Sequence, residues 1–270
     1  MKKLFVLALL LVSIFALSAC TSSNEEEERR TLIMGTSARF FPFEFVADPG
    51  QGVIGQYAGI DLSLVARIAQ YLDVDIIVRD QEFVGLILAL QNREIDFIAA
   101  GMTIRPDREE VVNFTVPYFN AGQYVIVRGD NTEINSMADL AGKLVGVQLA
   151  TTGDMAVTDG HEANVVNFGS IVRFNDPNPG ILDVLSGSLD AFIIDAPVAR
   201  GFVANHQGNL RAFADPGGFF GPESFGMAFH KDDVELLAQF NEVLERLIAE
   251  GYVTYLYEYY TTHHAQHAGN

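Results

Sequence analysis

The sequence contains no tryptophan, one cysteine and few basic residues: 17 Lys and Arg stand against 35 Asp and Glu, a formal net charge of −18. A single cysteine excludes a disulfide within the chain. The shortage of positive charge argues against a nucleic-acid partner, which would require a basic face. Histidines gather only near the end of the chain, at His263, His264 and His267, in a stretch that we interpret as a polar tail. We expect neither a metal nor a cofactor.

Long apolar runs are also scarce. Leu4–Leu17 is one such run, and it follows a positively charged start. It is too short and wrongly flanked for a membrane-spanning helix, so we interpret residues 1–19 as a secretory signal peptide. Its end, Leu17-Ser18-Ala19-Cys20, resembles a bacterial lipobox, in which the cysteine is diacylated and becomes the first mature residue. The alternative is an ordinary signal peptide with an incidental Cys20.

Residues 20–30 are polar, acidic and aperiodic. Such a composition predicts a solvated tether between a lipid and a folded body. We therefore expect an extracytoplasmic protein, in the periplasm or on the outer face of the cell membrane. A lipid on Cys20 would attach it to the membrane.

The stretch Asp96–Arg108, DFIAAGMTIRPDR, carries the first sign of a binding site. Its short apolar run predicts a buried strand, and its proline suits the first turn of a helix. The strand end therefore brings Gly101, Thr103 and Arg108 to the rim where open α/β sheets bind ligands. Arginine grips both oxygens of a carboxylate, so these residues are suited to a small carboxylate ligand. The alternative is a surface loop with a solvated arginine.

Strand-like and helix-like segments alternate along the chain, which predicts an α/β fold with mainly parallel sheets. Asp61 precedes an amphipathic helical pattern, and we interpret it as the helix cap, with ligand contact as the alternative. Strands are expected at residues 31–36, 74–78, 97–100, 123–128, 143–148, 164–168, 190–195 and 224–229. Helices are expected at residues 62–72, 86–91, 135–141, 181–186, 233–249 and 253–260.

A second pair of strand ends repeats the first arrangement. Residues 149–154 form a strand-to-helix turn whose hydroxyls and N–H groups suit an anion. Asp190–Asp195 has the same spacing as Asp96–Gly101, which suggests two similar lobes. Asp195 ends a buried strand, and an unpaired buried carboxylate requires a cationic partner. The alternative is that Asp195 caps the helix that follows.

With these features placed, the sequence resembles the polar amino-acid family of bacterial solute-binding proteins, family 3. The resemblance covers residues 32–260, nearly the whole mature chain. It rests on the order and spacing of several motifs: FPFEF at 41–45, GIDLSLVARIA at 59–69, FVGLILAL at 83–90, AAGMTIRPDR at 99–108, VNFTVPY at 112–118, ADLAGKLVGVQLATTG at 138–153 and LDAFIIDAP at 189–197.

The resemblance implies a two-lobe periplasmic-binding-protein-like fold of type II, with two mixed, mainly parallel sheets and a hinged ligand cleft. Lobe 1 would comprise residues 31–119 and 222–260, lobe 2 residues 120–221, and a disordered tail residues 261–270. Two crossing segments would lie near residues 118–122 and 218–224.

The resemblance also assigns site residues. Arg108, Thr103 and Thr152 would hold the α-carboxylate of a free amino acid. Asp195 would take the α-ammonium group, assisted by the Gly101 carbonyl. The side chain of the ligand would lie among residues matching its walls and contacts: Phe40, Phe83, Ser37 and Gln148.

Departures from the family pattern bear on the ligand. Ser37 stands where several members that bind cationic or amide side chains carry Asp, and Ile194 and Gln148 stand where some carry polar or charged contacts. We therefore expect a neutral amino acid, polar or moderately apolar, and not lysine, arginine or histidine. Arg39 would favour an acidic ligand if it turned into the cleft.

The partners implied are an amino-acid ligand, an ABC permease and the membrane, with the protein itself a monomer. The alternative from another class is an enzyme, a cyclohexadienyl or arogenate dehydratase on the same fold. Such chemistry needs a general acid. Glu44 and Glu82 are the candidates, but both are expected to be solvated, so we do not expect an enzyme. A sensory role without transport is a further alternative.

Overall fold

The structure, a computed structural model, describes residues 29–264, of which residues 31–264 form one compact unit. Its first five-stranded sheet has the order β5-β1-β6-β15-β7. Strand β1 lies between β5 and β6 and runs parallel to both, whereas β15 runs antiparallel to β6 and β7. The strands are β1 (Thr31–Thr36), β5 (Asp75–Asp80), β6 (Phe97–Ile98), β7 (Val112–Phe114) and β15 (Ala228–His230).

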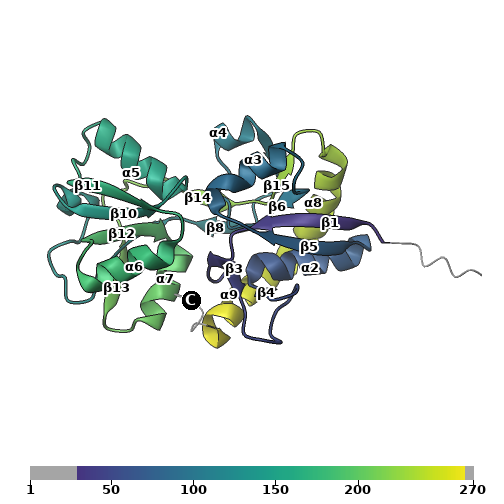
Figure 1. Ribbon diagram of the computed structural model, residues 1–270, viewed down its shortest axis with the longest axis horizontal. Coiled ribbons are helices and arrows are strands. Elements are labelled where there is room, and N and C mark those ends of the chain that lie inside the picture. Colours follow the sequence, from purple (N-terminus) through teal and green to yellow (C-terminus); the bar gives the residue numbers. More distant parts are fainter. Residues whose placement is uncertain (1–28, 265–270) are drawn as a thin grey trace, which may run out of the picture. The chain divides into compact units, whose positions relative to one another are not determined.

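A second five-stranded sheet has the order β11-β10-β12-β9-β13. Here β10 is parallel to β11 and β12, and β9 is antiparallel to β12 and β13. The strands are β9 (Gln123–Arg128), β10 (Leu144–Gln148), β11 (Ser170–Phe174), β12 (Ala191–Asp195) and β13 (Leu210–Ala214). Two mixed sheets in separate lobes confirm the predicted fold class (Figure 1).

Helices cover both sheets because each presents an apolar stripe. In α2 (Ile60–Leu72) the buried face includes Leu62, Val65 and Ile68, and this helix packs against α8 and α9. The other helices of lobe 1 are η1 (Phe83–Gly85), α3 (Leu86–Gln91), α4 (Pro106–Glu109), α8 (Val234–Ala249) and α9 (Tyr252–His263). Lobe 2 carries η2 (Met137–Leu140), α5 (Thr152–Glu162), α6 (Pro177–Ser186) and α7 (Ala196–Asn205).

Two crossing strands join the lobes. β8 (Phe119–Ala121) leads from the first sheet into the second, β14 (Glu223–Phe225) leads back, and the two pair antiparallel (Figure 1). Phe43 packs its ring edge-on against Phe119 and Phe225, with centroids 4.9 and 5.0 Å away. This aromatic cluster fixes the crossing strands to lobe 1, with the fully buried Phe43 at its centre. A small antiparallel sheet of β2 (Arg39–Phe40), β3 (Glu44–Val46) and β4 (Tyr57–Ala58) lies nearby in the chain.

Two of the predicted strands are wrong in position. Residues 164–168 form no strand, because α5 ends at Glu162 and Asn164 takes a left-handed conformation with φ 57°. The strand begins two residues after Phe168, as β11. The strand expected at 224–229 is divided at Gly226, whose N–H donates to the Met102 carbonyl, so that β14 pairs with β8 and β15 with β6.

Two predictions about helix ends are also wrong. Asp61 does not cap α2: the N-cap is Gly59, no side chain caps it, and Asp61 is buried inside the first turn. At the other end of the chain, α9 continues through His263, so Thr261–His263 belong to a helix and not to a tail. The signal peptide and Cys20 lie outside the described residues. Within residues 29–264 we find no helix long and apolar enough to cross a membrane.

Candidate functional site

A cavity with an empty volume of about 310 Å³ lies between the lobes, at the carboxyl ends of β1, β6, β10 and β12. The two sheets therefore meet at the rims where α/β sheets usually bind ligands. All nine residues predicted to bind the ligand line this one cavity. They are Ser37, Phe40, Phe83, Gly101, Thr103 and Arg108 from lobe 1, and Gln148, Thr152 and Asp195 from lobe 2.

Arg108 is the buried cation of the site. It lies on α4, which begins with Pro106, and its side chain reaches across the cavity. Nη1 donates a hydrogen bond to the Thr103 carbonyl (2.8 Å) and Nη2 donates to the Ala150 carbonyl of lobe 2 (3.1 Å). Burial lowers the pKa of Arg108 to about 10, so the guanidinium stays charged near neutral pH. It is therefore placed to receive an anionic group between the two lobes.

The start of α5 supplies the lobe 2 side of this anion site. Thr151 is the N-cap and accepts a hydrogen bond from the Asp154 N–H (3.3 Å), and Thr152 is the first helical residue. Ala150, just before them, has a left-handed φ of 62°. Free N–H groups and the positive end of the helix dipole favour a carboxylate here. Thr151 also lines the cavity; the sequence analysis included it in the anion-binding turn but assigned only Thr152 to the ligand.

Asp195 stands at the carboxyl end of β12, opposite Arg108. It occupies the N-cap position of α7, as the alternative expected, but its side chain makes no capping hydrogen bond to that helix. Its Oδ1 is buried and has no hydrogen-bond partner within the described chain. Burial and repulsion from Glu223 raise the pKa of Asp195 to about 8. A buried carboxylate without a full set of donors is a site that favours a cation.

Two aromatic rings form walls of the cavity. The Phe83 ring centroid lies 5.4 Å from the Arg108 guanidinium carbon. Phe40 lies so close to Gly101 that a Cβ on that glycine would fall 2.7 Å from the ring. Gly101 also has φ +51°, a conformation that favours glycine. Glycine at this position lets the ring and the backbone wall approach closely.

Glu44 also lines the cavity, although the sequence analysis did not place it among the ligand-binding residues. It lies on β3, is fully buried, and neither of its carboxylate oxygens has a hydrogen-bond partner in the described part of the chain. Burial, and then repulsion from Asp61, Asp80 and Asp195, raises its pKa well above the ordinary value. The expectation that Glu44 is solvated is wrong. A signal was present, since alternation within FPFEF turns Glu44 away from its core neighbours Phe43 and Phe45.

The remaining predicted contacts are now placed. Gln148 lines the cavity and donates from Nε2 to the Asn175 carbonyl (3.2 Å). Ile194 is buried in its sheet away from the cavity lining. Arg39 does not turn into the cavity: it forms ion pairs with Asp80 (3.1 Å) and, across the lobes, with Asp176 (3.3 Å). Its pairing removes the basis for an acidic ligand.

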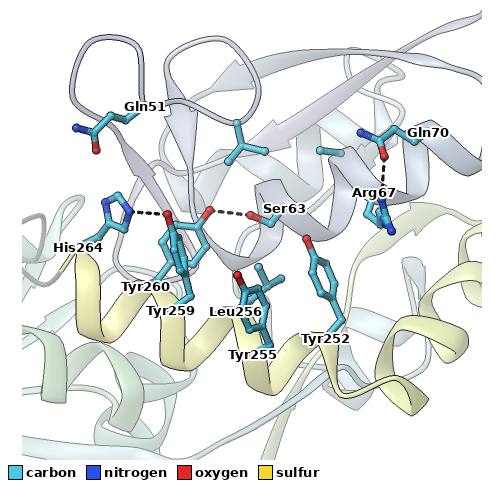
Figure 2. A pocket seen from close by; sticks show the side chains of 12 residues that line it. Gln51, Ser63, Arg67, Gln70, Tyr252, Tyr255, Leu256, Tyr259, Tyr260 and His264 are labelled. Carbon is cyan, nitrogen blue, oxygen red and sulfur yellow. Dashed lines mark hydrogen bonds between the residues drawn. The ribbon is translucent and has the colours of Figure 1, made fainter.

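A second groove lies on lobe 1, between α2 and α9 (Figure 2). Tyr252, Tyr255 and Tyr259 line it along α9, with neighbouring rings stacked about 6.0 and 6.1 Å apart. The Tyr260 hydroxyl shares a 2.7 Å hydrogen bond with Ser63, which fixes α9 to α2. None of the residues predicted to bind the ligand belongs to this groove.

Residues 32–263 match the family model of bacterial extracellular solute-binding proteins, family 3. The chain belongs to this family. It is 33% identical over 253 residues to the arginine-binding extracellular protein ArtP of Bacillus subtilis, covering 93% of this chain and 94% of the relative.

Further relatives show a range of named ligands. The solved structure of the arginine-, lysine-, histidine-binding protein ArtJ from Geobacillus stearothermophilus is 31% identical, with a TM-score of 0.75 over 86% of this chain and 96% of that chain. The L-cystine-binding protein TcyJ of Escherichia coli is 27% identical over 84% of this chain and 81% of the relative. All three relatives are named as binding proteins, so a dehydratase is not favoured. The expectation of a neutral ligand gains no support from the arginine-binding relatives.

Proposed function

We propose that this protein captures a free amino acid with a cationic side chain, arginine first among them, and delivers it to an ABC permease. The observation that carries the proposal is Glu44, whose two buried carboxylate oxygens have no partner among the described residues and whose side chain lines the cavity. The cavity thus holds two carboxylates, Glu44 and Asp195, against the single guanidinium of Arg108. A ligand with two cationic groups and one anionic group complements these charges.

The α-groups of the ligand are assigned as the family resemblance implies. Arg108, Thr103 and the start of α5 at Thr152 hold the α-carboxylate. Asp195 and the Gly101 carbonyl hold the α-ammonium group. Arg108 supplies the positive charge from lobe 1 and Asp195 supplies the negative charge from lobe 2, so a zwitterion engages both lobes at once.

The side chain of the ligand is assigned to the region of Glu44. Two unpartnered carboxylate oxygens match the parallel donors of a guanidinium, which forms bidentate pairs with carboxylates. Phe40 and Phe83 offer aromatic walls, and a guanidinium over a ring face gains about 0.5–2 kcal/mol. Ser37 and Gln148 would add neutral polar contacts. A neutral side chain would leave the Glu44 carboxyl without a donor, which is costly at a buried position.

Ligand capture is coupled to closure of the lobes in this proposal. We place the lobe boundaries at the crossing strands, with residues 31–119 and 222–260 in lobe 1 and 120–221 in lobe 2. A ligand that touches both lobes binds the closed form better and shifts the population toward it. We further propose that the protein acts outside the cytoplasm as a monomer, attached to the membrane by a lipid on Cys20.

Isothermal titration calorimetry of the mature chain with arginine, lysine, histidine, glutamine and cystine tests the proposal. We expect arginine to bind with the highest affinity. Glu44→Gln should weaken arginine binding by about 30-fold or more, since losing one partner of a buried charge pair costs roughly 2–5 kcal/mol. Glutamine binding should be unchanged or stronger in this variant.

Two results would contradict the assignment. Arginine binding that is unaffected by Glu44→Gln would remove Glu44 from the side-chain site. A wild-type protein that binds glutamine and ignores arginine would restore the neutral ligand. Glu82→Gln is the matched control, because Glu82 precedes η1 outside the cavity lining and should leave affinity unchanged.

A further inference from the structure

A buried carboxylate behind the cavity connects its wall to a crossing strand. Asp61 is the second residue of α2 and is fully buried. Its Oδ2 accepts a hydrogen bond from the Gly101 N–H (2.9 Å). The Tyr118 hydroxyl donates to the same carboxylate, 2.8 Å from Oδ1 and 2.9 Å from Oδ2. Asp61 itself does not line the cavity.

The two partners of Asp61 belong to different parts of the binding machinery. Gly101 lines the cavity beneath the Phe40 ring. Tyr118 directly precedes β8, and its N–H donates to the Phe225 carbonyl at the end of β14 (3.0 Å). The Asp61 carboxylate therefore links the cavity wall at Gly101 with Tyr118, which precedes β8 and is hydrogen-bonded to β14.

We propose that Asp61 is a positioning residue, which fixes the cavity wall at Gly101 to the crossing strands through Tyr118, so that ligand capture and lobe closure act on one connected unit. The inference rests on the proposed function, because it concerns binding of a cationic amino acid in the same cavity. Asp61 acts through Gly101 and Tyr118 and touches no ligand atom.

The first physical reason is the polarity of the wall. Asp61 takes the Gly101 N–H, which is thereby withheld from the cavity. With its N–H engaged in this way, the Gly101 peptide can offer the cavity only its carbonyl oxygen, which suits an ammonium or guanidinium group, because such a group has donors only. The left-handed conformation of Gly101 and its close contact with Phe40 make the position sensitive to any shift of that peptide.

The second reason is charge. Asp61 contributes to the repulsion that raises the pKa of Glu44, and burial raises the pKa of Asp61 itself to about 7. The Gly101 N–H and the Tyr118 hydroxyl oppose that rise by donating to the charged form. The groups that face Asp61 are thus Tyr118 and Glu44. A cationic ligand beside Glu44 favours the ionised form of Asp61, and an ionised carboxylate accepts both hydrogen bonds more strongly.

Two variants and one control test this role. Asp61→Asn keeps the shape but loses the charge and one acceptor, and Tyr118→Phe removes only the hydroxyl donor. Asp96→Asn is the matched control, because Asp96 accepts a backbone N–H from Ile33 (2.6 Å) in the same lobe, away from the cavity lining. Arginine affinity is measured by calorimetry, and hydrogen exchange is followed with and without arginine at peptides covering Gly101 and β8.

We expect Asp61→Asn to weaken arginine binding about tenfold or more, the effect of a hydrogen bond to a charged group, and Tyr118→Phe by about three- to tenfold, the effect of an ordinary hydrogen bond. In the wild type, arginine should slow exchange at both Gly101 and β8. In Asp61→Asn saturated with arginine, the protection at β8 should be lost. Asp96→Asn should lower the thermal stability and leave the arginine affinity within about twofold of the wild type. If Asp61 had a purely structural role, Asp61→Asn would behave in the same way.

Three outcomes overturn the inference. The first is an Asp61→Asn protein whose arginine affinity and β8 protection equal those of the wild type. If that variant fails to fold, Tyr118→Phe decides, and unchanged affinity with unchanged exchange again refutes the role. A wild type that binds no amino acid overturns the proposed function and this inference together, whereas the first two outcomes leave the proposed function standing.

Discussion

Among the described residues, Arg108 supplies the only positive charge in the cavity lining, which also contains the two carboxyl groups of Glu44 and Asp195. Its place in the cavity could be predicted from the sequence, because the motif around it brings glycine, threonine and arginine to one strand end. Asp61 was misjudged because its partners lie far away in the sequence. The local sequence pattern predicts that an aspartate at the start of a helix caps that helix. The Asp61 carboxylate instead accepts hydrogen bonds from Gly101 and Tyr118. A single sequence does not show which side chains will be buried by elements that are distant along the chain.

Truncation of Arg108 tests the anion site. Arg108→Ala should weaken arginine binding by roughly 2–5 kcal/mol, because the ligand carboxylate would be desolvated without its partner. Arg105→Ala is the control: Arg105 pairs with Asp107 (2.9 Å) and does not line the cavity. Calorimetry measures the affinities, and circular dichroism checks that both variants are folded. Wild-type affinity in Arg108→Ala would refute the assigned role.

At the scale of the elements, the sequence predicted some strands well and others poorly. The parallel strands at residues 31–36, 143–148 and 190–195 follow from their apolar runs, and the structure confirms them within one residue. Residues 224–229 form one run in the sequence but two strands in the structure. The reason is that β14 pairs outside the sheet, with β8, before β15 enters it. Strand pairing over long sequence distances decides such a division.

The ion pair between β2 and α6 should influence ligand release. Arg39 joins Asp176 across the lobes and Asp80 within lobe 1, and its side chain is 39% exposed. Exposed pairs contribute up to about 1 kcal/mol and are screened by salt. We expect Arg39→Gln to speed ligand release about two- to fivefold in 50 mM NaCl, measured by stopped flow. The difference should vanish in 500 mM NaCl.

A control variant separates the loss of the ion pair between the lobes from the mere loss of one positive charge. Arg79 pairs with Glu94 (3.9 Å) within lobe 1, so Arg79→Gln should release ligand at the wild-type rate in both salts. Release from Arg39→Gln that is fast at high salt as well would point to a packing effect of the side chain.

For the whole molecule, the excess of buried carboxyl groups links stability to pH. The pKa is about 8 for Asp195 and about 7 for Asp61, against an ordinary value of 3.8. The folded protein thus retains protons that the unfolded chain releases above pH 4. Stability from these two groups is present at low pH, falls as pH rises toward 8, and then levels off.

Thermal unfolding between pH 5 and pH 9 measures this dependence. Without ligand, the Tm of the wild type should fall through the range up to about pH 8, and Asp195→Asn should show a shallower decline. Saturating arginine should reduce the fall, because the ligand's positive charges replace the protons and it binds only the folded state. A slope that is the same in Asp195→Asn and the wild type would show that another group is responsible.

The position of β15 in the first sheet has a consequence for how the protein is made. This strand lies between β6 and β7, although it is synthesised long after both of them. β7 pairs with no other strand in that sheet, and α9, the last described helix, completes the packing against α2. Lobe 1 therefore cannot finish folding until β15 and α9 have been synthesised. For a polypeptide carrying the signal peptide proposed at residues 1–19, this delay would keep the chain unfolded and competent for threading through a translocation channel.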